Sequence, residues 1–174
     1  MRKCFFFDRD GVLNHSIVKN GKPYSPNELN EVKISYYAFE IIRYLKYRNF
    51  LTIVVTNQPD VKRKIVSIEI VKSINNYLKK KLKFDDLFVC YDDKDYSFYR
   101  KPKPGMIFEA KKKWNINLKK SYIVGDRDKD IKAGLNSGLK TIFIDNGYFE
   151  KKPMFSNYKI NNLREIKKIL WQRK

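Results

Sequence analysis

Two aspartates, Asp8 and Asp10, directly follow an apolar run at residues 4–7 that predicts a buried strand. Carboxylates one residue apart at a strand end repel each other, and this raises the pKa of at least one unless a cation or hydrogen bonds compensate. An isolated Asp-x-Asp pair is usually a solvated turn. A chemical role therefore depends on whether other polar groups reach the same end of the same sheet.

Three later segments bring such groups. Residues 51–56 predict a β-branched strand that ends in Thr56, and residues 121–124 predict a strand followed by Asp126. Lys101 lies in a proline-rich loop that leads into a helix. Ligands of open parallel sheets bind beyond the carboxyl ends of the strands, so we expect these side chains to meet Asp8 and Asp10 at one rim.

This set of groups suits phosphoryl transfer. The carboxylates of Asp8, Asp10 and Asp126 are hard oxygen ligands, which favour Mg²⁺. Lys101 and Thr56 supply an ammonium and a hydroxyl for the oxygens of a phosphoryl group. Positioning and charge neutralisation are the main requirements of that reaction.

His15 is the only histidine, so no Ser-His-Asp or Cys-His set competes for the role of nucleophile. An aspartate carboxylate can serve instead, through an aspartyl-phosphate. We expect His15 to be a loop side chain near the site. The spacing of Asp130 from Asp126 lets Asp130 support the metal or Lys101, whereas Asp128 is expected to cap the following helix.

Strands and helices alternate along the whole chain. Strands are expected at 4–7, 51–56, 87–91, 121–124 and 141–144, and helices at 35–48, 65–82, 106–114 and 131–136 and near the C-terminus. Ser35 is expected to cap the first helix, with Phe39, Ile42 and Leu45 on its apolar face. The order predicts an α/β fold with a doubly wound, mostly parallel sheet, as one domain over residues 1–174 without a cap domain.

The loop at 14–31 and the C-terminal segment are less regular. The loop is too long for a simple connector, so it is either functional or partly disordered. In the C-terminal segment a cap near Asn161 or Asn162 precedes a helix with one apolar face, made of Leu163, Ile166, Ile169 and Leu170.

Composition excludes several classes of protein. Hydrophobic residues make up 43% of the 174 residues, which argues against disorder, and no run approaches the ~20 apolar residues of a membrane span. The first strand begins almost at Met1 and leaves no room for a signal peptide, while Cys4 and Cys90 lie in apolar runs typical of a core. We therefore expect a cytoplasmic protein, acting as a monomer.

The net charge of +19 raises the question of a nucleic-acid partner. The lysine clusters at 79–81, 111–113 and 167–168 fall late in expected helices, where cations interact favourably with the macrodipole. Stacking aromatics interleaved with arginines are not evident. A generally cationic surface is favoured, and a polyanion partner stays open.

Four segments, in order, resemble the motifs of the haloacid dehalogenase (HAD) superfamily of phosphatases. They are Asp8-Arg9-Asp10-Gly11-Val12, Val55-Thr56-Asn57-Gln58, Arg100-Lys101-Pro102 and Gly125-Asp126-x-x-x-Asp130. The second and third resemble most closely the variants found in subfamily IIIA, in D-glycero-D-manno-heptose 1,7-bisphosphate phosphatases and the related histidinol-phosphatases. The match spans nearly the whole chain and implies a Rossmann-like HAD core.

The resemblance also implies roles for individual residues. Asp8 would be the nucleophile and Asp10 the general acid and then base, with Mg²⁺ held by Asp8, the Asp10 carbonyl and Asp126. Thr56 and Lys101 would hold the phosphoryl group. Residues implied in substrate recognition are Asn57, Gln58, Arg100 and Arg127, together with Asn14, Ser16 and Lys19, for which ordinary loop polarity is the alternative.

One departure from the resembling phosphatases concerns their zinc loop, which has the form Cys-x-His and then Cys-x-Cys. The corresponding segments here are Cys90-Tyr91-Asp92 and Ser97-Phe98-Tyr99. One thiol cannot make a site that needs four nitrogen or sulfur ligands, so we expect no zinc. The loop would then be held by packing of Tyr91, Tyr96, Phe98 and Tyr99, or be mobile.

The expected function is hydrolysis of a small sugar phosphate, a heptose bisphosphate at its 7-phosphate, in the synthesis of surface-glycan precursors. A histidinol-phosphate phosphatase and a polynucleotide 3′-phosphatase remain alternatives. A phospho-accepting receiver module uses similar groups, but the order of Asp8, Thr56, Lys101 and Asp126 disfavours it.

Overall fold

The computed structural model describes residues 1–171 and contains a six-stranded parallel sheet. Its strand order is β5-β4-β1-β6-β7-β8. The strands are β1 (Lys3–Phe7), β4 (Phe50–Asn57), β5 (Asp86–Cys90), β6 (Tyr122–Gly125), β7 (Lys140–Ile144) and β8 (Tyr158–Ile160). The chain begins at the centre in β1, winds outward through β4 to β5, and returns to the other side of β1 at β6. This confirms the doubly wound α/β fold.

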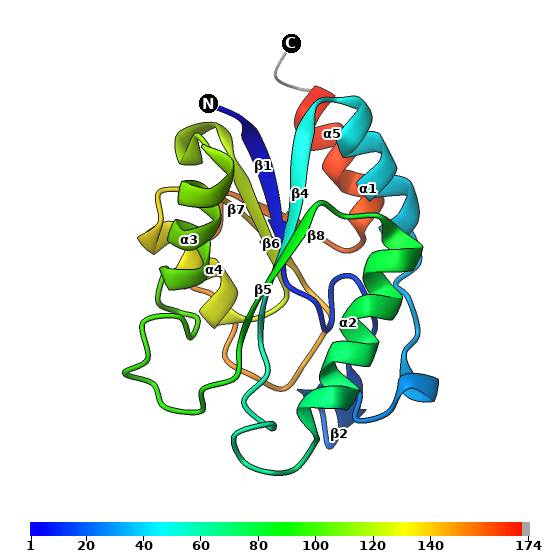
Figure 1. The fold of residues 1–174 in the computed structure, drawn as a ribbon. Coiled ribbons are helices and arrows are strands. Elements are labelled where there is room, and N and C mark those ends of the chain that lie inside the picture. Colours follow the sequence, from blue (N-terminus) through cyan, green and yellow to red (C-terminus); the bar gives the residue numbers. More distant parts are fainter. Residues whose placement is uncertain (172–174) are drawn as a thin grey trace.

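Helices cover both faces of the sheet (Figure 1). The helices α1 (Ala38–Tyr47), α2 (Ile68–Leu82) and α5 (Ile166–Trp171) lie on one face, and α3 (Gly105–Trp114) and α4 (Asp128–Asn136) lie on the other. Between β1 and β4 the described chain adds only a hairpin, a 3₁₀ turn and α1, and between β4 and β5 only α2. Within the described part of the chain, no cap domain covers the carboxyl edge. None of the helices in residues 1–171 is long and apolar enough to cross a membrane.

β1 is buried on both faces, as a central parallel strand must be. Phe5 and Phe7 face the core under α1, α2 and α5, whereas Cys4 and Phe6 face the core under α3 and α4. The Phe5 ring stacks on Tyr122 at 4.5 Å between centroids. These contacts fix the position of β1, the strand whose end carries Asp8.

Two helices begin three residues later than expected. α1 starts at Ala38, and the carbonyl of Ser35, not its side chain, accepts a hydrogen bond from the Ala38 N–H. α2 starts at Ile68, where the Ser67 hydroxyl accepts from Ile70 N. The predicted Ser35 cap was therefore wrong.

Phe39 was also expected in the core but is 55% exposed. Both it and Ala38 lie one turn before Ile42, so helical spacing alone does not distinguish them. The structure buries Ala38, Ile41, Ile42 and Leu45 and leaves the large Phe39 ring in solvent.

α4 is longer than expected at its start. It begins at Asp128, and Arg127 is the N-cap residue, with the Arg127 N–H donating to Asp130 Oδ2 at 3.0 Å. Asp128 was expected as the cap, but its carboxylate instead pairs with Lys132 at 2.7 Å.

The long loop after β1 contains a β-hairpin that was not expected, β2 (Ile17–Lys19) and β3 (Lys22–Tyr24). Its turn residues, Asn20 and Gly21, both have positive φ, and an Asn-Gly pair is a strong signal for such a turn. The loop is therefore ordered. A 3₁₀ turn at Leu29–Glu31 follows it.

The C-terminal segment adds the short edge strand β8, which was also not expected. The Asn162 side chain then accepts from Arg164 N and caps a 3₁₀ turn at Leu163–Glu165 that leads into α5. This confirms the expected cap and the apolar face of the terminal helix, which is buried at Leu163, Ile166, Ile169 and Leu170.

Truncating two phenylalanines tests the assignment of the core. Phe5→Ala should lower the free energy of unfolding by about 3–5 kcal/mol, because a fully buried ring is removed. Phe39→Ala should cost less than about 1 kcal/mol. Urea unfolding of both variants measures the difference, and Phe5→Leu serves if Phe5→Ala does not fold. Equal losses from Phe5→Leu and Phe39→Ala would contradict this assignment.

Candidate active site

Lys101 joins the ends of the central strands through its ammonium group. Its Nζ donates to Asp8 Oδ1 at 2.6 Å and to the Val55 carbonyl at 2.8 Å, and lies 2.7 Å from Asp130 Oδ1. All three side chains of this Asp8–Lys101–Asp130 triad are buried. Burial alone would lower the pKa of Lys101, but the carboxylates of Asp130 and Asp8 more than offset this and raise it. Lys101 therefore stays protonated at neutral pH.

Asn57 fixes the backbone at Lys101. Its Oδ1 accepts from Lys101 N and its Nδ2 donates to the Lys101 carbonyl, each at 3.0 Å. The following peptide bond, Lys101–Pro102, is cis. Asn57 was expected to contact substrate, and its side chain both borders the cleft and holds this loop.

Asp126 follows β6 and lies against Gly11. A Cβ at Gly11 would come within 1.7 Å of Asp126 Oδ2, and the φ of Gly11 is +80°, so this position requires glycine. Asn146 donates to the Gly11 carbonyl at 2.8 Å and lies 3.4 Å from Asp126 Oδ2. Tyr148 also hydrogen-bonds Asp126. Sequence reasoning missed Asn146 and Tyr148, since nothing in the motifs marks the loop after β7.

Asp8, Asp126 and Asp130 form a compact acidic cluster. Their ligand atoms lie within 4.8 Å of one another. Asp126 Oδ1 is buried without a hydrogen-bond partner, and no ion pair within residues 1–171 includes Asp126. Burial raises the pKa of Asp126, and the charges of Asp130 and Asp8 raise it further. Such an oxygen cluster fits a hard divalent cation such as Mg²⁺.

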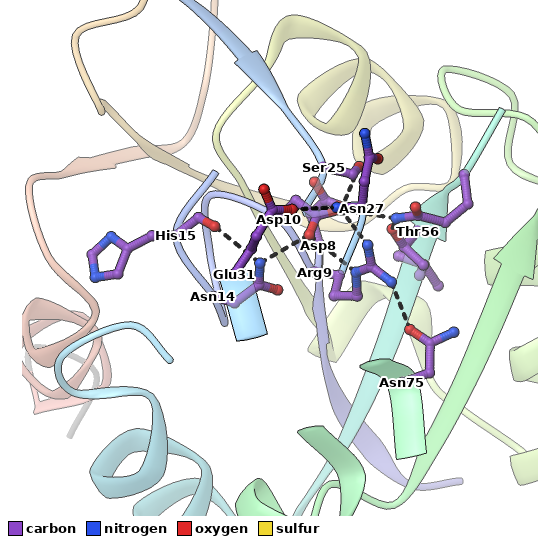
Figure 2. Close-up of polar contacts among 12 residues, drawn as sticks. Asp8, Arg9, Asp10, Asn14, His15, Ser25, Asn27, Glu31, Thr56 and Asn75 are labelled. Atoms are coloured by element: carbon purple, nitrogen blue, oxygen red, sulfur yellow. Dashed lines mark hydrogen bonds and ion pairs between the residues drawn. The ribbon is translucent and has the colours of Figure 1, made fainter. Parts of the chain in front are cut away.

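Asp10 lies apart from this cluster and is held by hydrogen-bond donors on several sides (Figure 2). Arg9 makes a bidentate contact with both of its carboxylate oxygens, at 3.1 and 2.9 Å. The other donors are Asn14 Nδ2 at 2.9 Å, Ser25 Oγ at 2.8 Å and Gln58 Nε2 at 2.8 Å.

These donors keep Asp10 ionised. Burial alone would raise its pKa, but Arg9, Asn14 and Gln58 more than offset this and lower it. Arg9 is thus the compensating cation that a pair of carboxylates one residue apart needs. Arg9 is itself fully buried and donates to Asn75 Oδ1 on α2 at 2.8 Å. No sequence motif marks Asn75, which lies far from Arg9 along the chain.

Asn14 and Gln58 were expected to bind substrate, but the structure turns them inward. Asn14 is fully buried and Gln58 is 2% exposed, and both donate to Asp10. Gln58 also donates to Thr56 Oγ1 at 3.0 Å, which leaves the Thr56 hydroxyl proton free to point elsewhere. Figure 2 shows His15 turned away from Asp8, and its side chain is exposed.

These groups border a polar cavity, called here the inner cleft. From the strand ends it is lined by Asp8, Asp10, Thr56, Asn57 and Lys101. The hairpin and the residues that flank it contribute Ser16, Tyr24 and Ser25, and the start of α4 contributes Lys129 and the N-cap residue Arg127. The rim expected from the sequence is therefore assembled, with Ser25, Tyr24 and Lys129 as additions that sequence reasoning missed.

A wider outer groove continues from the inner cleft over the hairpin. Lys19 lines this groove and not the inner cleft. Arg127 borders both but is engaged by Glu150 in a bidentate ion pair, with Arg127 Nε 2.7 Å from Glu150 Oε2. This pair engages Nε and Nη2 and leaves the Nη1 donors of Arg127 available to an anion.

Arg100 was expected to recognise substrate, and the structure bonds it to the loop at 92–99. Its Nε donates to Asp95 Oδ1 and an Nη to the Asp92 carbonyl, both at 3.2 Å. The expected packing of Tyr96 was wrong, since Tyr96 is 78% exposed, whereas Phe98 contacts Tyr99 edge to face. Arg100 therefore anchors, through these two hydrogen bonds, a loop whose aromatic rings are mostly exposed to solvent. Arg100 also borders the outer groove.

Known proteins resemble this chain in sequence and in fold. The HAD-hydrolase-like family model matches residues 98–165. The D-glycero-alpha-D-manno-heptose-1,7-bisphosphate 7-phosphatase of Campylobacter jejuni is 30% identical over 94% of this chain and 93% of its own length. The D-glycero-beta-D-manno-heptose-1,7-bisphosphate 7-phosphatase of Helicobacter pylori strain J99 is 27% identical over 79% of this chain and 80% of its own length.

The crystal structure of a D,D-heptose 1,7-bisphosphate phosphatase from B. bronchiseptica, complexed with magnesium and phosphate, has the same fold. It aligns with a TM-score of 0.82 over 99% of both chains at 21% identity.

A double-mutant cycle tests the buried pair of Arg9 and Asp10. Arg9→Met should lower the free energy of unfolding by about 3–5 kcal/mol, because it leaves the Asp10 carboxylate buried without its cation. Arg9→Met combined with Asp10→Asn should cost clearly less, since no unpaired charge remains. Urea unfolding of the four proteins under one condition gives the coupling energy. Strictly additive losses would mean that the two side chains do not depend on each other.

Proposed function

This chain belongs to the HAD family of phosphatases, and from that membership we propose that it hydrolyses the 7-phosphate of D-glycero-D-manno-heptose 1,7-bisphosphate in the synthesis of surface-glycan precursors. It is a phosphoric monoester hydrolase. The observation that carries the proposal is the buried Asp8 carboxylate, 2.6 Å from Lys101 Nζ, on the wall of the inner cleft. The names of the relatives support the choice of substrate.

In the proposed reaction, an Asp8 carboxylate oxygen attacks phosphorus and the ester P–O bond breaks. Asp10, ionised at rest, would first take up a proton from solvent and then give it to the leaving sugar oxygen. Asp10 then takes a proton from water as that water attacks phosphorus, and the bond to Asp8 breaks. The donors around Asp10 favour its carboxylate form and so support this second step most directly.

The remaining groups of the inner cleft would bind and orient. Asp8, Asp126 and the Asp10 carbonyl would hold Mg²⁺, which supplies neutralisation of the negative charge on the phosphoryl oxygens. Asp130 keeps Lys101 against Asp8, and the Thr56 hydroxyl donates to the phosphoryl group. Ser16, which lines the inner cleft, would contact a sugar hydroxyl, and Lys19, which lines the outer groove, would lie further out.

We further infer that the enzyme works as a single-domain cytoplasmic monomer on a small substrate. The groove is open, because no cap covers the carboxyl edge of the sheet, so the hairpin carries the specificity. Nucleic acid is not favoured as a partner, since the lysine clusters lie along helices and not in the cleft.

A phosphate-release screen tests the substrate. With Mg²⁺ present, the anomers of heptose 1,7-bisphosphate should be hydrolysed with a higher kcat/KM than histidinol phosphate, common sugar monophosphates or a 3′-phosphorylated oligonucleotide. Chelation should abolish turnover and added Mg²⁺ should restore it. Asp8→Asn should lower kcat by at least about 1,000-fold. A preference for the oligonucleotide, or an active Asp8→Asn variant, would refute the proposal.

We also propose that the loop at 92–99 needs no zinc, because Arg100 takes over its positioning. Metal analysis of the purified enzyme should find no stoichiometric zinc. Arg100→Ala should make this loop a site of rapid limited proteolysis, since its contacts to Asp95 and Asp92 are lost. Lys103→Ala, in the following segment, is the matched control. One zinc per chain, or equal cleavage of both variants, would contradict the proposal.

A further inference from the structure

Lys129 lines both the inner cleft and the outer groove, although no motif drew attention to it. It is the second residue of α4 and precedes Asp130 of the triad. Its side chain is largely buried. A buried ammonium that borders a phosphatase cleft needs an explanation.

No ion pair or hydrogen bond of the Lys129 side chain occurs within residues 1–171, even though carboxylates are near. On one side in sequence, Asp128 pairs with Lys132. On the other, Asp130 is occupied by Lys101 and by the Arg127 N–H. The Lys129 side chain is therefore largely buried, and its ammonium is unpaired.

Lys129 also sits where a cation is unfavourable. It lies in the first turn of a helix, at the positive end of the macrodipole. Burial lowers its pKa, as does the nearby charge of Arg127 and, to a lesser extent, Lys101, whereas Asp130 and Asp8 raise it. Burial, the helix dipole and the neighbouring cations all raise the free energy of the charged Lys129 side chain. An anion bound beside it would lower that free energy.

The other two cations of the inner cleft are already engaged. Lys101 donates to Asp8 and to the Val55 carbonyl and forms an ion pair with Asp130. Arg127 is held by Glu150. Among the described residues of the cleft, Lys129 is thus the cation with none of its donors engaged, and Thr56 offers a hydroxyl in the same cleft.

We propose that Lys129 binds the reacting phosphoryl group of the substrate, as an additional cation that supplies donors to its non-bridging oxygens. This deepens the proposed function and rests on it for the identity of the substrate. The ligand class is a phosphate monoester dianion, and inorganic phosphate as product.

Inorganic phosphate binding and melting of the Mg²⁺-loaded protein test this without any turnover. Lys129→Met should weaken phosphate binding, measured by calorimetry, by about tenfold or more, because a charged donor is lost. Lys129→Arg should stay within about threefold of the parent, and the exposed Lys132→Met on the same helix within about twofold. Without phosphate, Lys129→Met should raise the melting temperature by about 2–4 °C, since an unpaired buried charge is removed. A purely structural lysine would shift it downward.

Turnover of p-nitrophenyl phosphate then shows whether Lys129 binds the reacting phosphoryl group or the second phosphate of a bisphosphate. The KM of Lys129→Met should rise for this monophosphate as it does for a bisphosphate. Unchanged phosphate affinity, or a KM that rises only for the bisphosphate, would overturn the inference. Binding of inorganic phosphate needs no sugar. Weaker phosphate binding by Lys129→Met would therefore support the role of Lys129 even if the heptose proved not to be the substrate. Conversely, heptose turnover with unchanged phosphate binding would leave the function standing and reject the role of Lys129.

Discussion

The buried contact of Lys101 with Asp8 and Asp130 is the interaction on which the rest of the site depends. It connects the end of β1 to the first turn of α4 and to the loop before α3, which are far apart in the sequence. Taking three charges out of water is costly unless each is satisfied. The structure meets that condition with the Val55 carbonyl on Lys101 and the Arg127 N–H on Asp130. The fold thus holds the proposed nucleophile in one orientation before any ligand arrives.

The second aspartate of the pair is held in a different way. Asp10 has its own cation, Arg9, which is anchored to α2 through Asn75. Two carboxylates one residue apart therefore point to separate partners, and their mutual repulsion is offset on each side. Within residues 1–171, Asp126 Oδ1 is a buried carboxylate oxygen of this site with neither a hydrogen bond nor an ion pair, which is why the metal is expected there.

The sequence predicted the sheet, its winding and the convergence of the strand ends, because apolar strands and their polar termini are local signals. Asp8, Asp10, Thr56, Lys101 and Asp126 are all found at the predicted rim. What it did not predict are contacts between distant segments. Nothing local says that Asn14 and Gln58 turn toward Asp10, that Arg100 bonds its own loop, or that Arg127 pairs with Glu150. The motif matches identify residue types, whereas the direction of each side chain depends on its tertiary neighbours.

The central claim is that Asp8 carries the phosphoryl group during turnover, and the Asp10→Asn variant with p-nitrophenyl phosphate tests it most directly. This leaving group departs without a proton, so the first step should proceed while the second, which needs Asp10 as base, is slowed. The account predicts a burst of nearly one p-nitrophenol per chain. Quenching with borohydride should then find Asp8 as the one reduced aspartate by mass spectrometry. A full burst with an unmodified Asp8, or with the phosphoryl group on another residue, would contradict the account.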